Sequence, residues 1–168
     1  MTFFTADLHL GHKNILKHTN RPFASVEEMD SVLIANINQV VATNDELYIL
    51  GDFAWQASNY GKYRNRIKVR KLHIVTGNHD ATSLAKYVST MRDSVYQKIE
   101  GHKVHMSHYP HASWHGRTHG SIHLYGHSHG SLESTLDSVW PGRKAMDVGV
   151  DNCDLRPLSF TEILNRIS

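Results

Sequence analysis

Short apolar runs rich in β-branched and aromatic residues recur along the chain and predict β-strands. Each run spans four or five residues, a length that suits a strand better than a helix. The five clearest runs cover residues 3–6, 47–50, 72–76, 104–107 and 122–125. Residues 95–99 predict a hairpin partner for the fourth run, with the turn at 100–103.

A helical pattern lies between the first two predicted strands. Ser25 and Glu28 have the spacing of a capping box, and apolar residues recur on one face after it. These apolar residues are Met29, Leu33, Ile37, Val40 and Val41. Ser159 and Glu162 repeat the capping box before a C-terminal helix that carries Phe160, Ile163, Leu164 and Ile167. Shorter helices are predicted at 58–67 and 81–88, and the order of elements predicts a mixed α/β layered fold.

Composition narrows the class of protein. A chain of 168 residues with 40% hydrophobic residues is the size of one domain, and the absence of repeats and linker-like stretches predicts a single domain over 1–168. The formal charge of +2 arises from 18 basic and 16 acidic residues spread along the sequence. Stable binding to nucleic acid is therefore disfavoured, because it usually requires a basic run or patch.

Cysteine usage and hydropathy bear on location. Cys153 is the single cysteine, so an internal disulfide is impossible and a reducing compartment fits best. No apolar stretch approaches the roughly 20 residues that a membrane-spanning helix requires, and no signal-like start is present. We expect a cytoplasmic protein without a membrane partner.

The 14 histidines are several times the usual share for this length, and many of them follow predicted strands. The five main runs end in residues that can bind metals. The clusters are Asp7-Leu8-His9, Gly51-Asp52, Gly77-Asn78-His79-Asp80, His108 and Gly126-His127-Ser128-His129. Because ligand sites in α/β sheets assemble at the carboxyl ends of strands, we expect these clusters to meet.

The donor types indicate which metals would bind. Carboxylate, amide and imidazole donors without thiolate suit Mn²⁺, Fe²⁺, Co²⁺, Ni²⁺ or Zn²⁺ better than Ca²⁺ or Mg²⁺. With His79 left out, the set comprises two carboxylates, one amide and four histidines, which is too many donors for one ion. The count predicts a centre of two divalent ions, with manganese as the first choice.

At this point the sequence resembles the calcineurin-like metallophosphoesterases, whose signature carries these five blocks in this order. The resemblance covers residues 7–129, and any one block alone would be a weak match. It implies two packed β-sheets flanked by helices, a four-layer α/β/β/α sandwich. The opening residues 7–13 and the segment Asn20-Arg21-Pro22-Phe23 look like a small phosphoesterase subgroup of bacteria and their phages.

The resemblance also implies a role for each site residue. One metal would be held by Asp7, His9, Asp52 and His129, and the other by Asp52, Asn78, His108 and His127, with Asp52 as the bridge. A hydroxide shared by the two metals would attack phosphorus in line with the leaving oxygen. His79 would be the general acid that protonates the leaving group, and Asp80 would orient His79 or tune its pKa.

The substrate is less defined than the chemistry. The run Gly51-Asp52-Phe53-Ala54-Trp55 lacks the arginine that protein phosphatases of this superfamily carry after Gly-Asp, which argues against phosphoproteins. We expect a small phosphate ester, with a phosphodiester or nucleotide favoured over a phosphomonoester. A catalytically inactive interaction module and a histidine-rich metal buffer are the alternatives from other classes, and the complete ligand set argues against both.

Several further residues have two interpretations. His12 is either part of the site or a histidine on a surface loop. Lys13, Arg21 and Arg117 could each meet the substrate phosphate, although a solvated surface charge is the simpler explanation for any one of them. Trp114, in the loop 109–120 that we expect beside the metals, could stack on a base or simply pack. We expect Trp55 to pack rather than to recognise a ligand.

Overall fold

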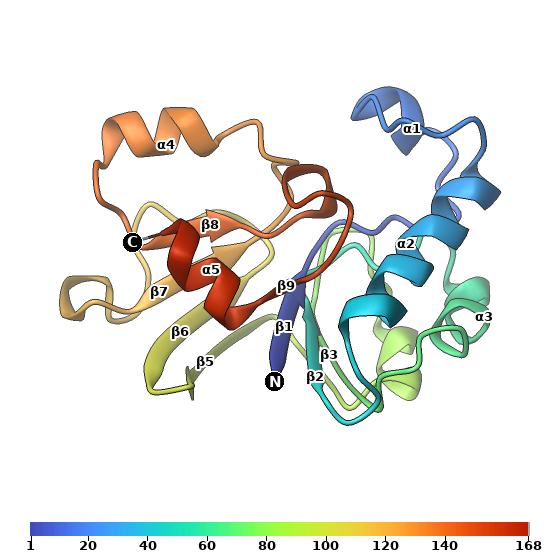
Figure 1. The fold of residues 1–168 in the computed structure, drawn as a ribbon, viewed down its shortest axis with the longest axis horizontal. Helices are drawn as coiled ribbons and strands as arrows, with labels where there is room; N and C mark the ends of the chain where they lie inside the picture. Colours follow the sequence, from blue (N-terminus) through green and yellow to red (C-terminus); the bar gives the residue numbers. More distant parts are fainter. Residues whose placement is uncertain (168) are drawn as a thin grey trace.

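Two β-sheets form the centre of the computed structural model, which describes residues 1–167 (Figure 1). The first sheet has the strand order β4-β3-β2-β1-β9 and the second has the order β5-β6-β7-β8. The strands of the first sheet are β1 (Thr2–Thr5), β2 (Glu46–Ile49), β3 (Lys71–Val75), β4 (Thr90–Arg92) and β9 (Leu158–Ser159). Those of the second are β5 (Ser94–Ile99), β6 (His102–Ser107), β7 (Ile122–Tyr125) and β8 (Ala145–Asp147).

The two faces of the first sheet pack into different hydrophobic cores. Phe3, Leu47 and Leu72 face an outer core, whereas Phe4 and Tyr48 face the core between the sheets. This follows from the two-residue period of a strand, which sends successive side chains to opposite faces. Residues on both faces are apolar, as expected for a mainly parallel sheet that is covered on both sides.

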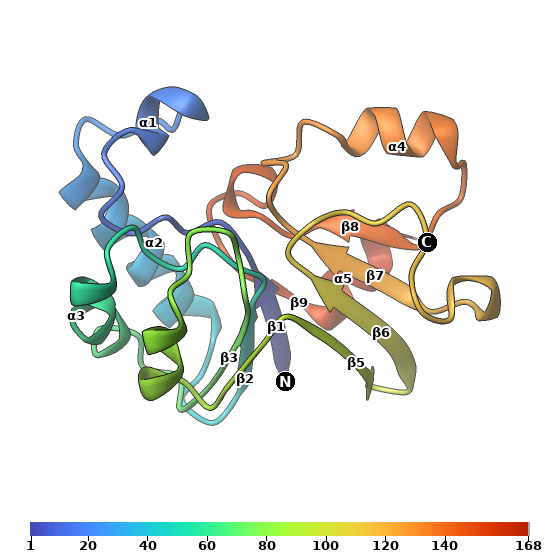
Figure 2. The same cartoon turned by 180° about the vertical axis from the view of Figure 1, so that it is seen from behind.

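Helices cover the outer faces of both sheets. The long helix α2 (Val26–Val40) and the short α3 (Tyr60–Arg64) pack on the first sheet, and α4 (Glu133–Val139) lies against the second (Figures 1 and 2). The helix α5 (Phe160–Arg166) instead contributes Phe160 and Ile163 to the core between the sheets. A one-turn helix, α1 (Ile15–His18), follows the first loop. The architecture of two packed sheets flanked by helices is confirmed.

Both predicted capping boxes mark helix starts, but only one is complete. Ser159 Oγ accepts from the Glu162 N–H, and the Glu162 carboxylate accepts from the Ser159 N–H. At α2, Ser25 Oγ accepts from the Glu28 N–H at 3.1 Å. The Glu28 carboxylate turns instead to the N–H of Ala24, one residue before the expected position, at 2.7 Å. Both arrangements satisfy N–H groups that a helix start leaves without partners.

The short segments were predicted less well than the long ones. The expected helix at 58–67 is a 3₁₀ turn (Ala57–Asn59) followed by α3, and the one at 81–88 is a 3₁₀ helix (Thr82–Tyr87). The hairpin turn is tighter than expected, because Glu100 and Gly101 alone make it with positive φ angles of 47° and 92°. Ser168, the last residue of the predicted domain, lies outside the described residues. Among residues 1–167, no helix is both long and apolar enough to cross a membrane.

Truncation of the α2 face measures how much the outer core stabilises the fold. Leu33 is 1% exposed and belongs to the outer core. We expect Leu33→Ala to lower the free energy of unfolding by about 2–5 kcal/mol, because it removes buried methyl groups and leaves a cavity. Urea denaturation measures this change. Gln39→Ala, on the exposed face of the same helix, is the control and should change stability by less than about 0.5 kcal/mol. Equal effects of the two changes would contradict the packing described.

Candidate metal centre

The loops that follow β1, β2, β3, β6 and β7 meet at one end of the two sheets. Backbone hydrogen bonds join the first two loops, from Asp7 N to Gly51 O at 3.0 Å and from His9 N to Asp52 O at 2.9 Å. The N–H of His127 donates to Asp7 Oδ2 at 2.9 Å, which ties the loop after β7 to the loop after β1. The five clusters predicted from the sequence therefore lie together.

The backbone of these loops is left-handed at several non-glycine residues. Asp7, His9, Asp52, His127 and His129 have φ between 49° and 68°. Such angles cost free energy and are found where surrounding contacts fix an unusual direction, often at functional sites. The strand β1 ends at Thr5, so Asp7 and His9 lie in the loop after it and not on one face of a strand. The left-handed turns give them their common direction.

Two glycines allow the loops to approach this closely. A Cβ on Gly51, whose φ is 96°, would lie 2.3 Å from His108 Nδ1. A Cβ on Gly77 would lie 2.3 Å from Asp52 Oδ1. Both contacts are far inside van der Waals distance, so only glycine fits at either position without moving a proposed ligand.

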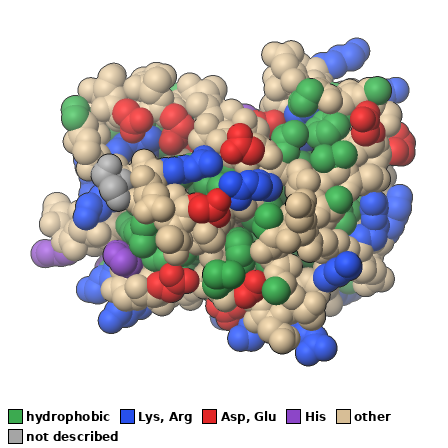
Figure 3. Space-filling model, viewed as in Figure 1, with side chains coloured by type: hydrophobic (Ala, Val, Ile, Leu, Met, Phe, Trp, Pro, Cys, Tyr) green, Lys and Arg blue, Asp and Glu red, His purple; other side chains and the backbone are tan. Residues whose placement is uncertain are grey.

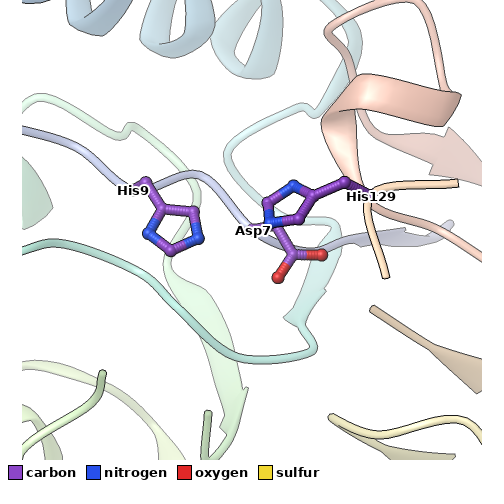
Figure 4. Close-up of side chains that lie close together, drawn as sticks. All are labelled: Asp7, His9 and His129. Carbon is purple, nitrogen blue, oxygen red and sulfur yellow. The ribbon is translucent and has the colours of Figure 1, made fainter. Parts of the chain in front are cut away.

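Asp7, His9 and His129 form the first group of potential ligands (Figure 4). One ligand atom from each side chain lies within 4.8 Å of the others. Figure 4 shows Asp7 and His9 on the segment that follows β1, with the ring of His129 reaching them from another loop. Asp7 and His9 are almost fully buried, so these donors face a confined space rather than open water.

Asp52, His108 and His127 form a second group of the same size. Asn78 joins it, because its Oδ1 lies 2.9 Å from His108 Nε2 and 3.1 Å from His127 Nδ1. Asp52 Oδ2 lies 3.4 Å from His9 Nε2 and 3.5 Å from His108 Nε2, which places this carboxylate between the two groups. His108 Nδ1 lies 2.8 Å from the carbonyl oxygen of Leu50, an arrangement that leaves Nε2 for the centre.

The donors fit divalent cations. Asp7 Oδ1 and His9 Nε2 are buried without a hydrogen-bond partner, which is costly unless another group satisfies them. Burial and the nearby carboxylates of Asp147 and Asp52 raise the pKa of Asp7 well above its usual range. Burial, followed by the charge of Arg21, lowers the pKa of His9 to about 2, so its ring keeps a lone pair for a ligand bond. A bound cation would stabilise the ionised carboxylate of Asp7 and accept the lone pair of His9 Nε2.

His79 lies at the edge of this centre. Its exposed ring is centred 5.3 Å from the ring of His9, and one of its nitrogens lies within 4.8 Å of ligand atoms of His9 and Asp52. The position allows either contact with a substrate or contact with a metal. The Asp80 carboxylate accepts from the N–H groups of Gly77, Asp52 and Phe53 at 2.9 Å, so it fixes the backbone of two loops and not the His79 ring.

Two supporting residues were not assigned to the centre from the sequence. Asp151 Oδ2 accepts from His129 Nδ1 at 2.7 Å, and Arg21 binds the same carboxylate with two nitrogens at 2.8 Å. Burial opposes ionisation, but the bonds from Arg21 and His129 prevail and lower the pKa of Asp151 to about 2. Arg21 also donates to the carbonyl oxygens of Asp7 and Leu8. It is therefore a buried brace between loops, neither a phosphate contact nor a solvated charge.

Asp147 is a third supporting residue, and it holds the loop that carries His127 and His129. Its buried carboxylate accepts from Ser128 Oγ at 2.6 Å and from the N–H of Gly130 at 2.9 Å. It also accepts from the N–H of Gly149 at 2.7 Å. Asp147 ends β8, a three-residue strand that the apolar pattern did not predict. Arg21 and Asp151, 130 positions apart, carry no local signal that would pair them.

A cleft of about 390 Å³ opens over the centre. It is lined by His9, Asp52, Asn78, His79, His127 and His129 of the centre and by His12, Asn14, Ile15, His18 and Trp55 beside it. His12 is 8% exposed, so it belongs to the site rather than to a surface loop. Trp114 and Arg117 are not among the lining residues, so most of the loop 109–120 lies away from the cleft, contrary to expectation. Trp114 packs, with its Nε1 donating to Ser121 O.

The chain is similar in sequence to two proteins over most of its length, and it is similar in fold to a third. The uncharacterized protein MJ1445 of Methanocaldococcus jannaschii is 33% identical over 167 residues, which cover 98% of this chain and 90% of that protein. Gene 66 protein of Mycobacterium phage L5 is 29% identical over 184 residues, which cover 89% of this chain and 86% of that protein. A protein of unknown function from Aquifex aeolicus, AQ665, shares the fold with a TM-score of 0.81 at 24% identity, over 99% of this chain and 98% of that chain. No protein-family model matches.

The site and the sequence comparison together characterise the chain. Five blocks of potential metal ligands, each after a strand of the two packed sheets, meet at one centre. The chain belongs to one family with the Methanocaldococcus jannaschii protein, because the two are 33% identical over nearly all of both chains.

The hydrogen bond between Asp151 and His129 generates a prediction about metal affinity. We expect Asp151→Asn to weaken metal binding by roughly 10- to 100-fold, because His129 loses the carboxylate that orients its ring. Competition with a chromophoric chelator measures the affinity. Asp154→Asn, on a 76% exposed side chain three positions away, is the matched control and should bind metal as the wild type does. Unchanged metal affinity in Asp151→Asn would show that the Asp151 carboxylate does not contribute to metal binding through His129.

Proposed function

We propose that the protein is a dinuclear metal-dependent phosphoesterase. The observation that carries the proposal is the pair of ligand groups with Asp52 between them. Its carboxylate oxygen lies 3.4 Å from a nitrogen of His9 in one group and 3.5 Å from a nitrogen of His108 in the other. A single carboxylate oxygen between nitrogen donors of the two ligand groups suits two cations that share a ligand.

Each residue then has a role in the proposed reaction. Asp7, His9 and His129 would hold one metal, and Asn78, His108 and His127 the other, with Asp52 shared. When bound, the two ions supply Lewis acidity and lower the pKa of a coordinated water toward neutral pH. Arg21 and Asp151 keep the His129 ring oriented. The Asp80 carboxylate holds the loops of Asp52 and Asn78 together through their backbone N–H groups.

His79 is the proposed general acid. The residue follows Asn78, and its backbone N–H donates to Asp52 Oδ1 at 3.0 Å, which fixes the start of the side chain beside the centre. The ring is exposed to the cleft, where it can reach the leaving oxygen of an ester. A proton donated there neutralises the alkoxide as the bond to phosphorus breaks.

The cleft favours a small phosphodiester over a phosphomonoester. Among the described residues that line it, none is lysine or arginine. A monoester carries two negative charges near neutral pH and a diester carries one. With no cationic side chain to add to the charge of the two proposed metals, the cleft is better matched to the diester. Basic and acidic side chains are intermixed over the face drawn in Figure 3, which does not favour a long nucleic acid there.

An inactive interaction module on the same fold is the alternative. Loss of catalysis would leave gaps in the ligand set, but all seven proposed ligands are present and brought together. The completeness of the set favours the enzyme.

Metal removal tests the function directly. We expect chelation to abolish hydrolysis of bis(p-nitrophenyl) phosphate, and Mn²⁺, Co²⁺ or Ni²⁺ to restore it, because water alone is too weak a nucleophile at neutral pH. Release of nitrophenolate measures the rate, and circular dichroism shows that the metal-free protein remains folded. Full turnover by folded protein, after metal analysis has confirmed removal, would exclude the mechanism. Two bound ions without turnover of any ester would favour the interaction module.

Substitution of His79 separates acid catalysis from metal binding. We expect His79→Ala to retain its metals and to lower kcat by roughly 100-fold or more for esters with poor alkoxide leaving groups. Esters of nitrophenol should lose less, because nitrophenolate leaves without a proton. Steady-state kinetics with both ester types and metal analysis measure the two effects. Equal losses together with a missing metal would make His79 a ligand.

A further inference from the structure

Trp55 is an exposed aromatic side chain at the wall of the metal cleft. It is 43% exposed, whereas Trp114 is 8% exposed and packed. Its backbone is fixed by a hydrogen bond from Trp55 N to Leu10 O at 3.0 Å, beside an isolated bridge between Leu10 and Ala54. The side chain therefore stands on a rigid segment three residues after Asp52, and its exposure leaves indole surface free for contact.

His12 supports the indole from behind. The two rings stack with centroids 3.9 Å apart and an angle of 11° between their planes. His12 is itself buried, and its Nδ1 lies 3.4 Å from Nδ1 of His9. One face of Trp55 is thus occupied by a ring anchored to the centre. A flat aromatic surface held in this way loses little conformational entropy when a ligand ring is placed on it.

Trp55 lies close to the residues proposed to react with a substrate. Its ring is centred 5.3 Å from the ring of His79, and both line the cleft with the proposed metal ligands. Asn14 and His18 line the same cleft and offer hydrogen-bonding groups to the edge of a bound ring. A planar group resting on Trp55 would therefore be within reach of both hydrogen-bonding side chains and the metal centre.

We propose that Trp55, backed by His12, forms a stacking subsite for a nucleobase, so that the substrate is a phosphodiester of a nucleoside. The proposal rests on the proposed phosphoesterase function and names its substrate class. A cleft of about 390 Å³ is at the lower end of the range for small ligands and suits one nucleotide. Stacking tolerates any base because every base has a π-face, so the subsite selects for a base without selecting which one.

A pair of substrates that differ only in the base tests the subsite. The methyl ester of adenosine 5′-monophosphate and the methyl ester of ribose 5-phosphate carry the same reacting diester. We expect the wild type to prefer the adenosine ester in kcat/KM by roughly 5- to 100-fold, the range of a base stacked on an aromatic side chain. Trp55→Leu should remove this preference, so that kcat/KM for the two esters then differs by less than about twofold. Trp55→Phe should restore part of it.

Trp140→Phe is the matched control, because this tryptophan lies outside the lining of the cleft. It should retain the full preference for the adenosine ester. A binding measurement gives a readout that does not depend on turnover. Adenosine 5′-monophosphate should quench tryptophan fluorescence in the wild type and in Trp140→Phe, but not in Trp55→Leu.

The outcomes distinguish this proposal from the proposed function. Equal kcat/KM for the two esters in the wild type, or a preference that survives Trp55→Leu, would overturn the subsite while leaving the phosphoesterase intact. If the wild type hydrolyses no phosphate ester at all, the phosphoesterase proposal and the substrate assignment that rests on it fail together. The fluorescence titration then decides whether Trp55 still binds a base.

Discussion

Burial of several carboxylates in one small volume is the constraint on which the rest of this structure depends. Asp7, Asp52 and Asp147 are at most 2% exposed, and Asp151 lies beside them. Like charges held this closely in a poorly solvated space repel one another, so the fold must supply compensation. Asp147 and Asp151 receive it from protein donors, among them a bidentate guanidinium. Asp7 Oδ1 is left without any, and it faces the site where a cation would bind.

Donors can compensate the buried carboxylates only if the loops that carry them are held in place, and two features hold them. The parallel strands fix where each loop starts, because the register of β1, β2 and β3 is set by apolar residues on both faces. Left-handed residues and close-packed glycines then fix where each loop turns. The cost of these backbone angles is sustained because the loops are bonded to one another, so that none can relax alone.

The sequence predicted the parts of this arrangement whose signals are local. The strand β7 has the predicted bounds, and the residues of the centre follow strands in the expected order. The strands β4, β8 and β9 were missed because two or three residues carry no readable period. Their pairing with β3, β7 and β1 creates them. Asp151 and Arg21 were not assigned to the centre for a related reason. Their function depends on a contact across 130 positions that no spacing rule describes.

The same long-range contact affects how the centre can form during folding. The strand β9 pairs with β1, Val150 N donates to Ala6 O, and Asp151 then reaches His129 and Arg21. Closing a loop of this length carries an entropic cost, and non-local contacts of this kind slow folding. Until residues 150–160 dock, His129 has no carboxylate partner and Arg21 has no anion to neutralise it. The complete set of oriented donors therefore exists only once residues 150–160 have docked, and a chain without that contact offers metals an incomplete set.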